Sequence, residues 1–184
     1  VCQIDCETKS LSDLKKDGAH KYAAHPSTDV SLLAYAFDNG PIHLWRSSEP
    51  PPFSLINHVT NGGEVHAYNA AFELAIWNNV LTKKYGWPEL KIEQCRCIMV
   101  MARILGLPGS LDNAAKAVNL PIEKDGEGQK LMLKMSNAAN DNNWTDEDYE
   151  RLGQYCARDV EVQRELEKRL PPLSAHEQDL WVLD

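Results

Sequence analysis

Three short acidic segments, far apart in the chain, carry residue types that could bind metal ions. They are residues 5–7, residues 69–73 and residues 155–159. If the fold brings them together, four carboxylates would meet without a basic partner, and such groups repel and shift one another's pKa values. Divalent cations relieve this repulsion, and a set of oxygen ligands suits magnesium or manganese. Paired ions of this kind drive phosphodiester hydrolysis, so that is the chemistry these residues would support.

The first two segments each permit an ordinary structural interpretation as well. Asp5 and Glu7 end a short apolar run that predicts a buried strand over residues 1–5, and strand alternation places both carboxylates on one face. The alternative is a solvated strand end. Glu73 lies among apolar residues at the start of a helix for which Asn69 is a suitable N-cap. The alternative there is an acid that favours the helix dipole.

The third segment lies within a long predicted helix. Tyr155 and Asp159 are four residues apart, so their side chains stack on one helix face, which also carries apolar residues. A carboxylate on that face is costly unless it is paired or bound to a metal. The alternative is a salt bridge from Asp159 to Arg158 or another base. All three segments together, in this order, are far more specific than any one of them.

The elements around these segments predict the fold class. Strand patterns occupy residues 1–5, 31–37, 41–45 and 64–68, and helix patterns occupy residues 11–17, 53–60, 70–85, 96–105, 110–118, 128–135, 145–170 and 174–183. Strands therefore cluster early and helices late. This order favours a single α/β domain over residues 1–184, in which helices flank a mixed β-sheet.

Composition narrows the class of protein further. Apolar residues make up 43% and charged residues 25%, as in a soluble globular protein, and no apolar run approaches the roughly 20 residues that span a bilayer. Without a basic and apolar leader, and with five cysteines that lack zinc spacing, we expect a cytoplasmic protein with reduced thiols. The net charge of −8 argues against tight duplex binding and suits a substrate held at one chain end.

The three segments resemble the ExoI, ExoII and ExoIII motifs of the DEDD 3′–5′ exonucleases, which adopt a ribonuclease H-like fold. The similarity is greatest to the proofreading domain of family A DNA polymerases, in the form carried by phages and prophages. It extends to residues 34–38, 86–88, 106–111, 130–135 and 177–181. Tyr155 places the chain in the tyrosine subgroup. Two departures are Glu73, where ExoII usually has aspartate, and Tyr68, where phage relatives often have histidine.

The resemblance implies a two-metal exonuclease that uses Mg²⁺ or Mn²⁺ and releases nucleoside 5′-monophosphates. It assigns the first ion to Asp5, Glu7 and Asp159, and it assigns the second ion to Asp5 and Glu73. Tyr155 would orient the attacking water rather than act as a strong base, because a phenol titrates near pH 10.

The resemblance also implies contacts and partners. It assigns contact with the terminal nucleotide to Thr8 and Asn69, and a wedge against the last bases to Leu11. The implied partners are a single-stranded DNA 3′ end and a family A polymerase domain, attached in cis if this chain is an excised fragment. No membrane partner is implied.

Two other functions remain open on the sequence. One is an RNA exonuclease of the same superfamily, similar to RNase D, and the other is a catalytically silent domain that binds primer ends or scaffolds a polymerase. Retention of all four carboxylates argues against the silent domain. Three lysines after the first segment could follow a DNA backbone, with ordinary solvated surface as the alternative: Lys15, Lys16 and Lys21.

Overall fold

The fold is built on a five-stranded mixed sheet. The computed structural model describes residues 1–121 and 125–183, apart from the side chains of residues 141–143. The strands lie in the order β3-β2-β1-β4-β5, and they are β1 (Cys2–Lys9), β2 (Asp29–Phe37), β3 (Ile42–Arg46), β4 (Val65–Ala67) and β5 (Cys95–Cys97). The β1 strand pairs antiparallel with β2 and parallel with β4. The predicted α/β class with a mixed sheet is confirmed, and the architecture is compatible with a ribonuclease H-like fold.

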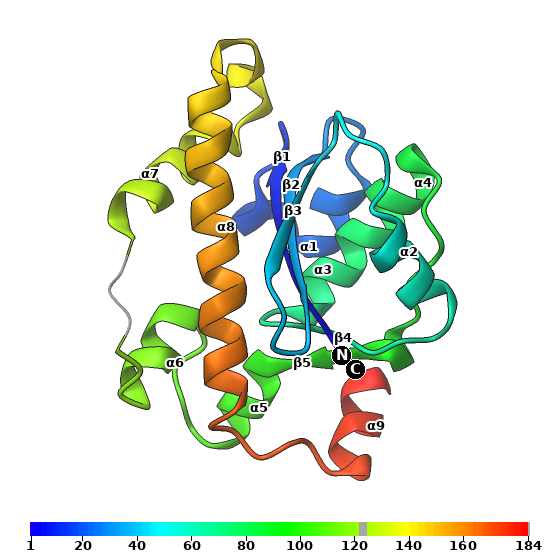
Figure 1. The fold of residues 1–184 in the computed structure, drawn as a ribbon, viewed down its shortest axis with the longest axis vertical. Coiled ribbons are helices and arrows are strands. Elements are labelled where there is room, and N and C mark those ends of the chain that lie inside the picture. Colours follow the sequence, from blue (N-terminus) through cyan, green and yellow to red (C-terminus); the bar gives the residue numbers. More distant parts are fainter. Residues whose placement is uncertain (122–124, 184) are drawn as a thin grey trace.

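Alternation along β1 directs its side chains to two different helical layers. Cys2, Ile4 and Cys6 belong to the main apolar core, on the side of α1 (Leu14–Ala24), α2 (Phe53–Thr60) and α3 (Ala70–Ile76). The side chains between them face α8 (Asp146–Glu167), which covers the other side of the sheet (Figure 1). The central strand therefore contributes apolar side chains to one layer and polar side chains to the other.

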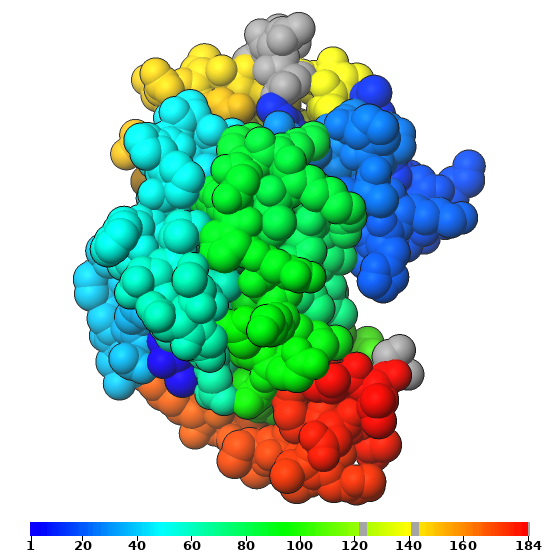
Figure 2. All heavy atoms as spheres, turned by 90° about the vertical axis from the view of Figure 1, so that its right-hand side faces the viewer, coloured from blue at the N-terminus to red at the C-terminus, as the bar shows by residue number. Residues whose placement is uncertain are grey.

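The remaining helices complete the two layers. They are the π-helical turn Trp77–Leu81, α4 (Thr82–Tyr85), a 3₁₀ turn Ile92–Gln94, α5 (Ile98–Ile104), α6 (Leu111–Ala117), α7 (Gly126–Met135), a 3₁₀ segment Ala138–Asn143 and α9 (Ala175–Leu183). Helix α9 packs beside β5, where the Gln178 side chain donates to the carbonyl oxygen of Cys95 at 3.1 Å (Figure 2). None of the described helices is both long and apolar enough to cross a membrane.

Several predicted boundaries require correction. The first strand continues to Lys9 because its antiparallel ladder with β2 extends that far. The helix predicted over residues 96–105 begins only at Ile98, because residues Cys95–Cys97 form the short strand β5, which a three-residue run without visible alternation could not reveal. The helix predicted over residues 11–17 begins at Leu14 and does not end at Gly18: that residue, with φ of +77°, only interrupts it, and the helix continues to Ala24. The helix predicted over residues 70–85 contains the π-helical turn.

Candidate metal centre

The second half of β1 holds Asp5 and Glu7, the first two of the four carboxylates. Pairing between β1 and β4 ends at Gln3, whereas pairing with β2 continues to Lys9. The ladder with β2 also shifts its register between Glu7 and Thr8, and such bulges often re-aim side chains near functional sites. Asp5 and Glu7 therefore lie beside a strand edge that β4 leaves uncovered.

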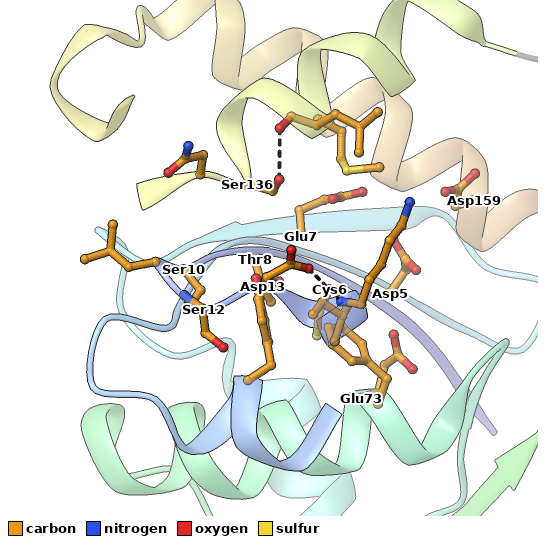
Figure 3. A pocket seen from close by; sticks show the side chains of 18 of the residues that line it. Asp5, Cys6, Glu7, Thr8, Ser10, Ser12, Asp13, Glu73, Ser136 and Asp159 are labelled. Atoms are coloured by element: carbon orange, nitrogen blue, oxygen red, sulfur yellow. Dashed lines mark hydrogen bonds between the residues drawn. The ribbon is translucent and has the colours of Figure 1, made fainter. Parts of the chain in front are cut away.

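The other predicted site residues reach this edge from two helices. Glu73 comes from the first turn of α3, and Tyr155 and Asp159 come from one face of α8. With Asp5 and Glu7 they line a single cleft of about 600 Å³, in which Figure 3 shows Asp5 between Glu73 and Asp159. The structure thus brings together the four carboxylates and the tyrosine that the three segments supply.

A cysteine that sequence reasoning did not assign to the site lies directly behind Asp5. The thiol of Cys156 is 3.3 Å from Asp5 Oδ2 and 3.4 Å from the Asp5 carbonyl oxygen. Among the described residues, Asp5, Glu7 and Cys156 form a group whose potential ligand atoms all lie within 4.8 Å of one another. The position of Cys156 inside the third acidic segment was the signal that could have indicated it.

Burial raises the pKa values of all four carboxylates, and repulsion from Asp5 adds to the shift at the other three. Burial raises the pKa of Asp5 to about 6, although a hydrogen bond from the Cys156 thiol opposes the shift. Burial, followed by repulsion from Asp5, raises the pKa of Asp159 to about 8. Burial and then repulsion from Asp5 hold the pKa values of Glu7 and Glu73 well above their usual range. The cleft therefore disfavours the charged carboxylates that it gathers.

A divalent cation would offset this accumulation of charge. No salt bridge joins Asp159 to Arg158 within the part of the chain that the structure describes, and Arg158 lowers the pKa of Asp159 less than burial and Asp5 raise it. Glu73 is 5% exposed, and its buried Oε2 atom has no hydrogen-bond partner. Four carboxylates with an unpartnered oxygen among them fit a hard cation such as Mg²⁺ or Mn²⁺.

The residues predicted to contact a nucleotide are not all in the cleft. Thr8 and Leu11 line it; the Thr8 hydroxyl lies 2.9 Å from the Tyr22 hydroxyl, and the Leu11 side chain is 64% exposed. Asn69 begins α3 as an exposed N-cap residue and is not among the described residues that line the cleft. Tyr68 packs against a second apolar cluster, and its backbone nitrogen donates to Gln163.

Comparison with known proteins connects the chain with a phage protein. No family model matches the sequence. A protein named DNA polymerase, from Bacillus phage SP02, is 34% identical over 198 aligned residues. The chain is similar to part of a DNA polymerase. The alignment includes 98% of this chain and 30% of the phage polymerase, so the chain spans less than a third of that protein's length.

Proposed function

We propose that residues 1–184 form a metal-dependent 3′–5′ exonuclease domain that hydrolyses phosphodiester bonds at the 3′ end of DNA. The observation that carries this proposal is the cleft itself, which four buried or half-buried carboxylates and a tyrosine line, and no salt bridge neutralises these carboxylates within the described part of the chain. Similarity to part of a phage DNA polymerase supports a DNA substrate and a proofreading role beside a polymerase domain. The products would be nucleoside 5′-monophosphates.

The carboxylates would hold two Mg²⁺ or Mn²⁺ ions, with Asp5, Glu7 and Asp159 at one ion and Asp5 and Glu73 at the other. When bound, such ions supply positive charge to the scissile phosphate and to the attacking and leaving oxygens. The chain's own task is to hold these oxygen ligands in place. The Cys156 thiol contributes by donating a hydrogen bond to Asp5.

Tyr155 would orient the attacking water. Burial, followed by repulsion from Asp159 and Glu7, raises the pKa of this phenol further above its usual range. The hydroxyl therefore stays protonated at neutral pH and does not act as the base that removes a proton. It also donates a hydrogen bond to Asp159, which lowers the pKa of that carboxyl and fixes the hydroxyl beside the site.

The walls of the cleft suit one end of a single strand. A volume of about 600 Å³ lies within the range of pockets that hold one small organic molecule, such as a nucleotide. Thr8 and Leu11 lie at this cleft, where they would contact the sugar and the base of the terminal nucleotide. The net charge of −8 opposes duplex binding, so we expect the enzyme to act on frayed or unpaired ends.

Digestion of a 5′-labelled single-stranded DNA oligonucleotide with magnesium tests the proposal. We expect a ladder that shortens from the 3′ end, and we expect the Asp159→Ala variant to leave the oligonucleotide intact. A labelled RNA of the same sequence should be degraded more slowly, and the reverse preference would support the alternative similar to RNase D. An oligonucleotide left intact by the wild-type chain with both magnesium and manganese would favour a silent primer-end-binding domain.

A further inference from the structure

One cation lines the cleft that otherwise gathers acids. Of the described residues around this cleft, Lys15 is the only lysine or arginine, and it shares the cleft with Asp13 as well as with the four carboxylates of the proposed metal centre. A strand entering this cleft brings phosphates, which the acidic side chains repel. Lys15 is therefore the one residue of the described lining that can attract them by its own charge.

The backbone of Lys15 is held in place at the edge of the cleft. The Asp13 carboxylate accepts hydrogen bonds from the backbone nitrogens of Lys15, at 2.9 Å, and Lys16, at 3.3 Å. Gly18 then interrupts the helix with φ of +77°. Figure 3 shows Asp13 beside the same cleft, and Figure 2 shows the segment that includes α1 projecting from the body of the molecule. The exposed side chain of Lys15 therefore extends from a backbone that the Asp13 carboxylate holds in place.

The three lysines of this segment differ in their surroundings. Lys16 and Lys21 both lie close enough to Asp17 to lower the pKa of that carboxyl. Lys15 does not contribute to this effect, and it forms no salt bridge within the described part of the chain. Lys16 is not among the described residues that line the cleft. Lys15 therefore lies at the cleft without a salt bridge among the described residues, whereas Lys16 and Lys21 lie near Asp17.

We propose that Lys15 is a positioning residue that binds a backbone phosphate of the single-stranded 3′ end. This inference rests on the proposed exonuclease function. Metal ions would neutralise the scissile phosphate, whereas the next phosphates along the strand would lie beside an acidic protein with no ion of their own. A lysine is a mobile point charge, which suits phosphates whose position changes as the strand shortens.

Paired substitutions test this inference. Binding of a fluorescent single-stranded oligonucleotide is measured with magnesium in the Asp159→Ala background, where cleavage is absent, and KM and kcat are measured with the active chain. Lys15→Ala should weaken binding about five- to tenfold at low salt, and it should reduce the slope of log affinity against log salt by about 0.7. It should raise KM more than it lowers kcat. Lys15→Arg should restore the salt slope, and Lys16→Ala should change neither quantity.

The outcomes separate this inference from the proposed function. If the active chain degrades DNA but Lys15→Ala and Lys16→Ala behave alike, the phosphate contact is wrong and the exonuclease stands. Loss of affinity with an unchanged salt slope also overturns the contact, because a phosphate contact must release counterions. If the chain neither binds nor degrades single-stranded DNA, both proposals fail. Melting temperatures of the two alanine variants within about 1 °C of each other would show that both fold equally well.

Discussion

The two ends of β1 bury acidic groups in opposite ways. At its start, Glu167 of α8 accepts a hydrogen bond from His66 Nδ1 at 2.5 Å and another from the Gln3 side chain. Glu64 accepts from Arg96 at 2.5 Å and lies 3.5 Å from His66 Nε2. We call this group the paired end, because each of its carboxylates has a basic or amide partner in the chain.

The acidic end, made of Asp5, Glu7, Glu73 and Asp159, lies farther along the same strand and beside the same helix. Among the described residues no salt bridge joins its carboxylates to a base, and their pKa values are raised. The chain can therefore supply partners for acids between β1 and α8, and it does so at one end only. This difference supports the proposed metal centre, in which a divalent cation would supply the counter-charge of the acidic end.

The largest expected difference between the two ends is in activity. Asp159→Asn should slow single-turnover cleavage of a DNA oligonucleotide roughly a thousandfold, because the loss of a metal ligand raises the activation barrier by several kcal/mol. Glu167→Gln, a matched change on the same helix, should slow it less than about threefold. Rapid-quench measurements at saturating magnesium compare the two. Equal losses would show that the acidic end has no special role in the chemistry.

The next effect is the pH dependence of stability in a chelating buffer. The acids of the acidic end have higher pKa values in the folded chain than in the unfolded chain, so the unfolded state loses its protons first as pH rises. Stability should fall from about pH 4, near the unfolded values, through about 6 for Asp5 and about 8 for Asp159. The raised pKa values of Glu7 and Glu73 act in the same direction. Each proton contributes up to about 1.4 kcal/mol per pH unit.

Urea unfolding between pH 4 and 9, repeated with magnesium, measures this dependence. Because other acids in the chain have lowered pKa values, the informative quantity is the difference from the Asp159→Asn variant, whose stability should fall less steeply. Magnesium should flatten the curve of the wild-type chain. A wild-type curve that rises more steeply than that of Asp159→Asn would contradict the raised pKa values.

A smaller effect concerns the stability of the same two variants without metal, for which the order should be the reverse of the order for activity. Without metal near pH 8, Glu167→Gln should destabilise the chain by about 2 kcal/mol, because His66 loses its charged partner. Asp159→Asn should stabilise it by about 1 kcal/mol, since it removes an acid that the fold does not compensate. Urea midpoints in EDTA compare them. Destabilisation by both substitutions would mean that the two ends are compensated alike.

The smallest expected effect concerns the thiol behind Asp5. Cys156→Ala removes the hydrogen-bond donor that Asp5 uses, so manganese affinity should fall about tenfold, as for other groups that orient a metal ligand. Cys156→Ser keeps a donor and should retain most of the affinity. Cys2→Ala, which empties an equally buried position at the other end of the strand, is the control. Titration calorimetry with manganese measures the affinity of each variant. Equal affinities for Cys156→Ala and Cys2→Ala would contradict this role of the thiol.

Sequence reasoning could anticipate part of this arrangement. Asp5, Glu73 and Asp159 lie in patterns of local spacing, and the structure places them around one cleft, although their roles as ligands stay predictions. The helix over residues 53–60 was predicted with the correct bounds, because its turn residues and apolar spacing are all local.

Such local patterns could not predict contacts between residues that are far apart in the sequence. The pair of His66 and Glu167 joins residues 101 positions apart, and the bond from Cys156 to Asp5 joins residues 151 positions apart. A buried thiol looks alike in a sequence whether it faces a carboxylate or a leucine. The short β5 strand is similar, since its pairing with β4 comes from the neighbouring strand rather than from its own three residues.

Helix α8 presents polar side chains to β1 at every fourth residue, in a row made of Tyr155, Asp159, Gln163 and Glu167. Gln163, which is fully buried, ties the middle of this row to the sheet by donating to the Ile4 carbonyl oxygen at 3.0 Å and accepting from the Tyr68 nitrogen at 2.8 Å. Inserting or deleting one residue would rotate the rest of the row by about 100°. A change in the length of the helix between Tyr155 and Glu167 would therefore separate one end of the strand from its partners.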